Sequence, residues 1–207
     1  MSIWESCVRM FRELLASEFG PYGELTPLQL SQLEHHFRLL LAWNQKLNLT
    51  RITEVEEAVR LHYCESLFLG RALPPGALRV ADLGSGGGFP GIPVAILRPD
   101  LHVALIESHQ RKSVFLREAT HDLPNVEVLP IRFSDCRERF DWGISRAVTP
   151  LDVLSSGLAS DYALLLGAKD TFAGAQVSKL PWGRDRILSV SRETVSRETV
   201  SRETPRF

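Results

Sequence analysis

Apolar residues recur at helical spacing in the first third of the chain. Between residues 3 and 19 they stand three or four positions apart, which predicts an amphipathic helix. Thr26–Gln29 supplies the cap, the proline and the capping-box partner that open a second helix. A second capping box at Thr53–Glu56 opens a third, running to about Leu73. Residues 1–76 are therefore predicted to be a helical extension that packs on the domain after it.

From residue 78 the pattern alternates between short apolar runs and helical segments. Strands are predicted near 78–83, 101–106, 126–129, 141–145 and 162–166, and helices near 91–97, 111–121 and 150–159. Right-handed crossovers join such strands into a mostly parallel sheet with helices on both faces. The fold class is thus α/β and Rossmann-like, with residues 77–189 forming the main domain.

The C-terminal part is unusual in two respects. Residues 169–188 leave little room for a last helix and an antiparallel hairpin, so a shortened hairpin is expected. Val190–Thr194 then repeats twice as a five-residue unit. A period of five matches neither helix nor strand, so residues 190–207 are predicted to be a disordered tail.

A glycine-rich turn follows the first predicted strand. Asp82 and Leu83 end the strand, and Gly84–Gly91 leads into a helix with Pro90 near its first turn. Glycine adopts positive φ and lets the backbone approach a ligand closely, so this turn is predicted to bind a nucleotide. The alternative is a plain surface turn, which rarely stands between a buried strand and a helix.

Two cofactors are compatible with the turn. The run from Gly86 matches the dinucleotide fingerprint, but the strand ends near Leu83, so the tight turn belongs to Gly84. S-adenosylmethionine needs no phosphate cradle, and its positive groups suit the carboxylate of Asp82. Glu107, at the end of the second strand, is placed to accept hydrogen bonds from ribose hydroxyls. These features favour S-adenosylmethionine over NAD.

Other candidates fall where predicted strands end, which is where ligands bind in parallel sheets. Phe133 could pack on an adenine, Ser134 could reach its edge, and Arg146 follows the fourth strand. Arg111 and Lys112 begin a helix, where cations are mildly unfavourable. They are either a solvated turn or, with Lys169, part of a phosphate-binding rim.

Composition narrows the possible functions. The chain has 207 residues and a net charge of −1, so binding nucleic acid would need a local basic patch. Its three cysteines are far apart and indicate neither disulfides nor a metal site. The charged N-terminus is unlike a signal peptide, and no apolar run is long enough to span a membrane. A cytoplasmic protein is expected. For His62 and Glu65, a structural role in hydrogen bonding is favoured over a catalytic or binding role.

Several motifs in this order resemble one family. They are Asn48–Thr50, His62–Leu67, Asp82–Pro93, Glu107–Lys112 and Ser145–Ala147. Over residues 25–170 they are similar to the bacterial small-subunit ribosomal RNA guanine-N7 methyltransferases, the glucose-inhibited division protein B family. The resemblance implies a class I fold that uses S-adenosylmethionine and methylates one guanine of the small-subunit RNA.

The resemblance also implies where the cofactor binds. It gives cofactor roles to Gly84, Phe89, Phe133 with Ser134, and Arg146; the strand ends and the turn already indicate Asp82, Gly86 and Glu107. The chain departs from the family at Glu65, at Arg111-Lys112 and at Ser134, where the family has Asp, Lys-Arg and Glu.

No catalytic residue is assigned, because N7 of neutral guanine has a free lone pair and needs no general base. Two alternatives stay open: a degenerate cofactor-binding ribosome-assembly factor and a nicotinamide-dependent oxidoreductase. The expected partner is small-subunit RNA or the ribosomal subunit, with no membrane, and the chain is expected to be a monomer.

Overall fold

The first helix has the predicted bounds, and the second begins where the sequence predicts. In the computed structural model, which describes residues 3–76, 78–170 and 174–192, α1 is Ile3–Phe19 and α2 is Pro27–Asn44. A short 3₁₀ turn, η1 (Gly20–Tyr22), separates them. Thr26 Oγ1 accepts from the backbone N–H of Gln29, whose side chain accepts from the N–H of Thr26. The first capping box is therefore confirmed.

The third predicted helix is divided into three pieces. They are α3 (Val55–Glu57), a π-helix η2 (Ala58–Cys64) and α4 (Glu65–Ala72). The N-cap is Glu54 and makes no side-chain capping bond, so the second capping box was wrong. In a π-helix each N–H bonds to the carbonyl five residues back, so side chains no longer follow the three- and four-residue spacing of an α-helix. In this segment His62 and Tyr63 are both buried.

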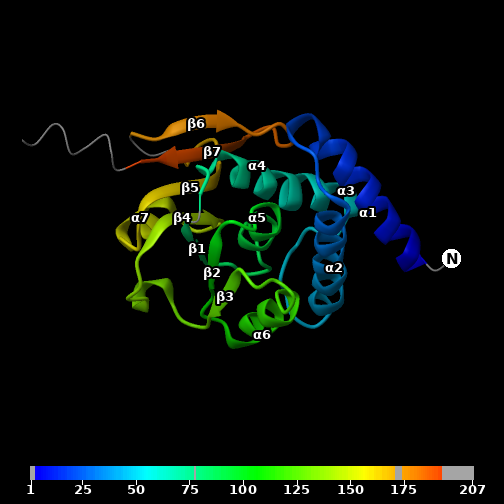
Figure 1. The fold of residues 1–207 in the computed structure, drawn as a ribbon, viewed down its shortest axis with the longest axis horizontal. Coiled ribbons are helices and arrows are strands. Elements are labelled where there is room, and N and C mark those ends of the chain that lie inside the picture. The colour runs from blue at the N-terminus through cyan, green and yellow to red at the C-terminus, as the bar shows by residue number, and fades with distance from the viewer. Residues whose placement is uncertain (1–2, 77, 171–173, 193–207) are drawn as a thin grey trace, which may run out of the picture.

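A seven-stranded sheet forms the centre of the molecule, in the order β3-β2-β1-β4-β5-β7-β6 (Figure 1). The five predicted strands pair in parallel. Their bounds are β1 Arg79–Leu83, β2 His102–Ile106, β3 Val126–Leu129, β4 Phe140–Arg146 and β5 Ala159–Gly167. From β1 the strand order runs to β2 and β3 on one side and to β4 and β5 on the other, so the order changes direction between β1 and β4. Ligands of such sheets bind next to this point, at the carboxyl ends of the strands.

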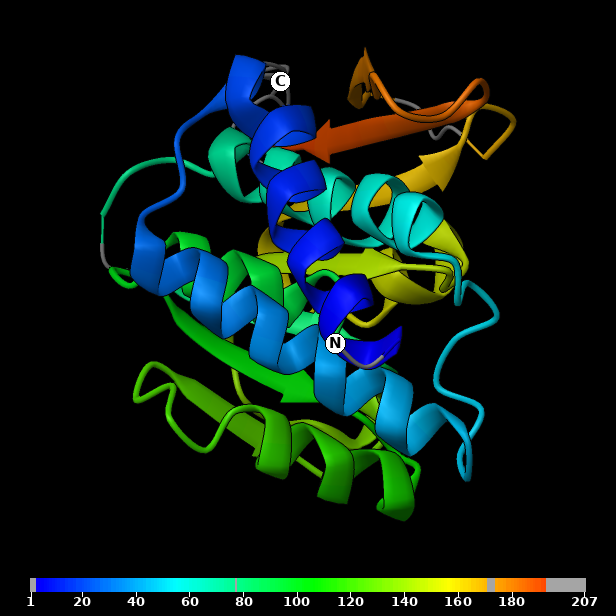
Figure 2. The same ribbon diagram turned by 90° about the vertical axis from the view of Figure 1, so that its right-hand side faces the viewer.

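Helices cover both faces, as predicted. The larger hydrophobic core joins one face to α5 (Gly91–Leu97), α6 (Gln110–Ala119) and the helical extension. The opposite face packs on α7 (Pro150–Ser155) and on the 3₁₀ turn η3 (Phe133–Asp135). Figure 2 shows α1 and α2 lying across the outside of the molecule, over the main domain. The extension thus shares the hydrophobic core of the main domain. None of the described helices is long and apolar enough to cross a membrane.

The C-terminal hairpin is present despite the short segment. β6 (Gln176–Lys179) pairs antiparallel with β7 (Arg186–Ser191), which pairs antiparallel with β5. The hairpin is short, as expected, because four exposed residues are enough for its edge strand β6. Val190 and Ser191, assigned to the repeat tail, belong to β7. The predicted disorder of residues 193–207 lies outside the described residues.

Candidate active site

The glycine turn lies at the carboxyl end of β1, as predicted. Gly84, Gly86 and Gly88 have φ values of +78°, +55° and +87°, which only glycine adopts readily. A Cβ on Gly84 would lie 2.8 Å from Cγ2 of Val148, whereas a Cβ on Gly86 would meet only the carbonyl oxygen of Gly84, at an ordinary contact distance of 3.8 Å. The turn is therefore tightly packed at its first glycine and open at its second, where a ligand can approach the backbone.

Most amide groups of the turn are used within the protein. The N–H groups of Gly84 and Ser85 donate to Ile106, and those of Gly88 and Phe89 donate to Ser85. A pyrophosphate would need such groups free, together with an open helix N-terminus. The turn thus suits a cofactor without phosphates and argues against the nicotinamide alternative.

Asp82 is buried beneath the glycine turn. Its side chain is fully buried, and Oδ2 accepts from the N–H of Gly91 at 3.0 Å, which closes the start of α5. Oδ1 has no partner, and burial raises the pKa of Asp82 to about 7. The carboxyl therefore fixes the turn on β1, and its contact with the cofactor stays a prediction.

Glu107 lies where the sequence places it, at the end of β2. Oε2 accepts from the N–H of Gly86 at 2.9 Å, and Oε1 accepts from the N–H of His109 at 2.7 Å. The side chain is 8 % exposed. Each carboxylate oxygen keeps a second lone pair, so Glu107 can hold the turn and still accept from ribose hydroxyls.

The ring of Phe89 points away from the open side of the turn. It stacks on His62 with ring centroids 4.4 Å apart and meets the edge of Tyr63 at 5.1 Å. These contacts belong to the core beneath the helical extension, and Phe89 is 7 % exposed. Any contact between Phe89 and a cofactor is therefore expected to be made by its backbone atoms.

The residues after β3 are placed for an adenine only in part. Phe133 is half-buried and packs on the core that contains Leu83 and Ile106, at the ends of β1 and β2. Ser134 is exposed, and its Oγ donates to the carboxylate of Asp135. The structure thus brings Phe133 to the predicted edge, while the Ser134 hydroxyl is bonded to its neighbour.

Arg146 ends β4 and contacts the helical extension. Its Nη1 donates to Nδ1 of His62, and Nε2 of that ring lies 2.7 Å from Oγ1 of Thr50. Burial lowers the pKa of Arg146 to about 10, so the guanidinium stays charged at neutral pH. Burial, and then Arg146, hold the pKa of His62 well below its ordinary value. A neutral imidazole therefore supports a half-buried cation.

An ion pair beside this group joins the extension to the hairpin. Glu65 is fully buried, and both its oxygens accept from Arg186 of β7, the closest at 2.8 Å from Nη2. The sequence did not indicate Arg186, which stands 121 positions from its partner. With Glu65 occupied, Arg146 makes no ion pair within the described residues.

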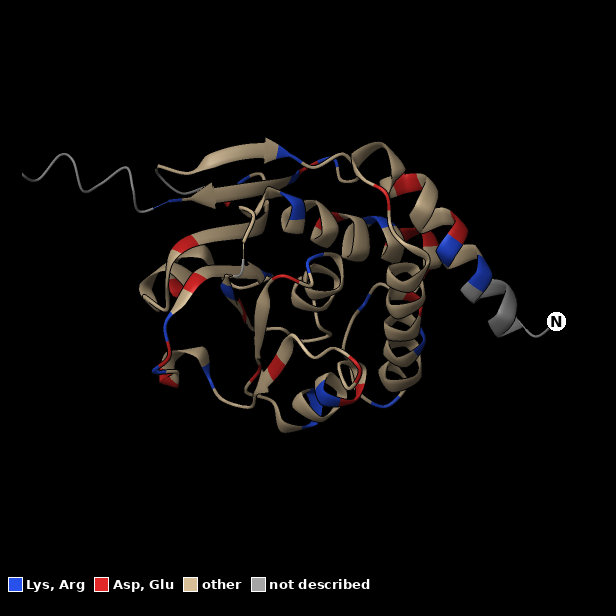
Figure 3. Ribbon diagram, viewed as in Figure 1, with Lys and Arg blue, Asp and Glu red and all other residues tan. Residues whose placement is uncertain are grey.

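The predicted basic rim is spread around the same edge. Arg111 and Lys112 are on the first turn of α6, and Lys169 is exposed in the turn after β5. Figure 3 shows basic and acidic segments together on α6. None of these cations touches the glycine turn in a described hydrogen bond, and their contact with RNA stays a prediction.

The comparisons with known proteins identify the chain's family. A family model described as rRNA small subunit methyltransferase G (GidB) matches residues 29–168. The chain belongs to this family. Its relative from Chromobacterium violaceum, named ribosomal RNA small subunit methyltransferase G, is 40 % identical over 167 residues, covering 77 % of this chain and 79 % of that one.

Other GidB relatives are covered less completely. The same-named protein of Moorella thermoacetica is 41 % identical over 141 residues, which are 63 % of this chain and 58 % of that one. This chain therefore aligns with about three fifths of the length of some curated relatives. Membership of the GidB family confirms the resemblance drawn from the motifs, and with it S-adenosylmethionine as the cofactor.

Solved structures agree on the fold. A SAM-dependent methyltransferase from Aquifex aeolicus superposes with a TM-score of 0.50 at 16 % identity, covering 65 % of this chain and 91 % of that one. A ribosomal protein L11 methylase from Lactobacillus delbrueckii gives a TM-score of 0.50 at 15 % identity, covering 63 % and 78 %. The class I methyltransferase fold is thereby confirmed.

Proposed function

We propose that this chain transfers a methyl group from S-adenosylmethionine to N7 of one guanine in small-subunit ribosomal RNA, acting as a monomer in the cytoplasm. The observation that carries the proposal is the family match over residues 29–168. The glycine turn supports it, because its open backbone at Gly86 and its internally bonded amides suit a nucleoside without phosphates.

The residues present fit that cofactor. Glu107 has lone pairs left for ribose hydroxyls, and Phe133 lies at the edge where an adenine would rest. Arg146 offers a cation without a carboxylate partner among the described residues. When bound, S-adenosylmethionine supplies an electrophilic methyl group on a positive sulfur.

The protein's part in the reaction is mainly positioning. N7 of guanine carries a lone pair and no proton, so no side chain has to remove one. Holding nucleophile and methyl group in line can lower the barrier by several kcal/mol. Arg146 is the charged group best placed to orient the cofactor or the base, because His62 fixes one side of its guanidinium.

Arg111, Lys112 and Lys169 are proposed as the rim that receives the RNA backbone. Phosphate contacts of this kind fix the position of an RNA without reading its sequence. The near-zero net charge of the chain makes such a local rim necessary.

The test is the ribosomal RNA of a strain that lacks this protein. Mass spectrometry of the digested small-subunit RNA is expected to show one 7-methylguanosine fewer than in the parent strain, restored by the wild-type gene. An unchanged content of 7-methylguanosine would overturn the proposal. Binding of RNA and cofactor without transfer would favour the assembly-factor alternative, which the Ser134 departure motivates.

A further inference from the structure

A hollow lies between the end of α2 and the start of α6. It is lined by Ala42, Trp43, Lys46, Leu47 and Arg111 and has a volume of about 320 Å³. That volume is at the lower end of the range typical of small-ligand sites, roughly 300–1,000 Å³. The α2–α6 hollow is therefore large enough for one flat ring and its substituents.

Its floor is aromatic. Trp43 is half-buried, and one side of its ring packs on Phe115 of α6 with centroids 5.9 Å apart. Within the described part of the chain its indole N–H finds no acceptor. Leu47 is also half-buried and extends the apolar surface. A partly covered indole with a free donor is a suitable surface for a stacked base.

Its rim is basic. Lys46 and Arg111 are both exposed, and neither forms an ion pair with another described residue. By contrast, Arg60, Arg79 and Arg98 each pair with a carboxylate within 2.7 Å. Two cations without acidic neighbours beside an aromatic ring are the combination that binds single-stranded nucleic acid.

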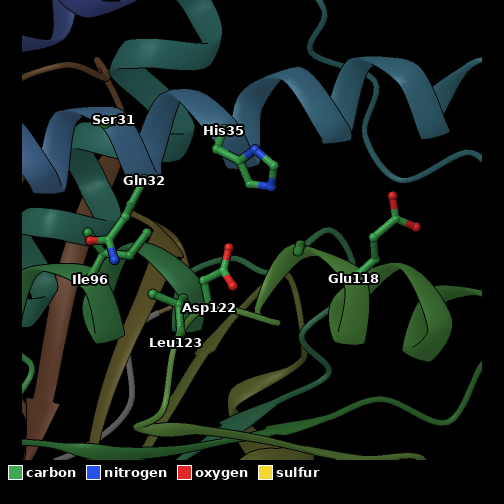
Figure 4. A pocket seen from close by; sticks show the side chains of 8 residues that line it. Ser31, Gln32, His35, Ile96, Glu118, Asp122 and Leu123 are labelled. Atoms are coloured by element: carbon green, nitrogen blue, oxygen red, sulfur yellow. The ribbon is translucent and has the colours of Figure 1, made fainter.

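The position of the hollow relates it to the site. Arg111 stands four residues after Glu107, whose carboxylate accepts from the N–H of Gly86 in the cofactor turn. The other end of the same two helices is opposite in character. A second hollow there is lined by Glu118 and Asp122 together with His35 (Figure 4), so an RNA backbone would be repelled from that end.

We propose that the α2–α6 hollow binds an unpaired nucleotide of the RNA substrate close to the target guanine. Its base stacks on Trp43, and its flanking phosphates meet Lys46 and Arg111. This inference rests on the proposed function and deepens it, because it names the form of RNA that the enzyme recognises. An unpaired segment is required, since a base within a duplex cannot present its face to an indole.

The test compares two doubly substituted proteins that lose the same charge. Lys46→Ala with Arg111→Ala removes the rim, and Arg117→Ala with Lys179→Ala removes two exposed cations elsewhere. The probe is in vitro transcribed small-subunit ribosomal RNA, and its affinity is measured by filter binding between 50 and 200 mM KCl. The slope of log affinity against log salt concentration reports how many phosphate contacts the protein makes, so the loss of about one contact per removed cation can be detected. Calorimetry with S-adenosylmethionine reports the cofactor site separately.

The rim variant is expected to bind RNA at least tenfold more weakly, with a salt slope smaller by about 1.4 than that of the control pair. Trp43→Leu is expected to weaken RNA binding at least fivefold, and Trp43→Phe to restore most of it, because a phenyl ring still stacks. S-adenosylmethionine affinity should stay within twofold in all of them. Thermal melting of each variant identifies any loss that comes from unfolding.

Three results would overturn the inference. Equal losses in the rim and control pairs would show a diffuse charge effect. Full RNA affinity in Trp43→Leu would remove the stacked base, and weaker cofactor binding in that variant would assign the hollow to the cofactor. If the wild-type protein binds RNA through the hollow but transfers no methyl group, the proposed function fails while the nucleotide-binding role of the hollow is kept. If the wild-type protein methylates RNA and the variants match the control, the proposed function is kept and the role of the hollow fails.

Discussion

Nδ1 of His62 accepts a hydrogen bond from Nη1 of Arg146, so the ring proton of His62 must be on Nε2, facing Oγ1 of Thr50. A guanidinium can only donate, which leaves Nδ1 as the acceptor. Thr50 in turn accepts from the N–H of Ile52 at 3.0 Å. One chain of hydrogen bonds thus runs from the helical extension to the end of β4, and it holds the cation of the site in place.

Arg146→Ala is expected to reduce kcat/KM at least a hundredfold while lowering the free energy of unfolding by only about 1 kcal/mol, because its described side-chain partner is a neutral ring. A methylation assay and a chemical denaturation curve measure the two effects. Parallel losses of activity and stability would contradict an orienting role for Arg146.

Thr50→Val is expected to lower kcat/KM about tenfold, because it removes the acceptor that fixes the His62 tautomer. Thr53→Val is the matched control: Thr53 is exposed, and the N-cap role predicted for it falls to Glu54. Equal activity in the two valine variants would show that the tautomer does not matter.

Gly86→Ala separates cofactor binding from folding. A Cβ there makes only an ordinary contact of 3.8 Å with the carbonyl oxygen of Gly84, so the substitution costs mainly the strain of a φ of +55°, about 1–2 kcal/mol. It also fills the place where a cofactor would approach the backbone. S-adenosylmethionine affinity, measured by calorimetry, is expected to fall at least tenfold with a melting temperature only a few degrees lower. Unchanged affinity would remove Gly86 from the site.

Asp82→Asn tests the buried carboxyl through pH. With a pKa of about 7 in the folded chain against an ordinary value of 3.8, Asp82 keeps a proton between these pH values that the unfolded chain has released. Wild-type stability therefore falls as pH rises through this window. Asparagine carries no such proton, so the melting temperature of the variant relative to wild type is expected to increase from pH 4 to pH 8. A difference independent of pH would show that Asp82 is ionised throughout.

Arg186→Ala should destabilise the fold more than any substitution named above. It leaves the fully buried carboxylate of Glu65 without its partner, which typically costs about 3–5 kcal/mol. Urea denaturation measures the loss. Adding Glu65→Gln to Arg186→Ala should recover part of it, because the buried charge is removed; no recovery would mean that packing, not charge, explains the effect.

The parallel part of the fold could be predicted from the sequence to within a few residues. β1, β2 and β3 lie where the short apolar runs predict them, and α5 has the predicted bounds, 91–97. α7 ends at Ser155, earlier than predicted, and Gly157 follows with a φ of +57°. Buried strands and helix ends are encoded locally, which is why single-sequence patterns reveal them.

The rest depended on contacts between distant segments. β6 is exposed throughout, so it has no apolar alternation to reveal it. The π-helix disrupts a periodicity that otherwise predicts one α-helix. Likewise, the role of Asp82 could not be assigned without knowing that the N–H of Gly91 reaches it. Glu107 was placed correctly because its position follows directly from the end of a strand.

The most direct measurement uses S-adenosylmethionine with a trideuterated methyl group. Wild-type protein is incubated with this cofactor and small-subunit ribosomal RNA from a strain that lacks the protein, and the nucleosides are analysed by mass spectrometry. Deuterated 7-methylguanosine is expected at about one per RNA molecule with the wild-type protein, and far less with Arg146→Ala. Absence of deuterated nucleoside, or label on any other base or ring position, would contradict the proposed function.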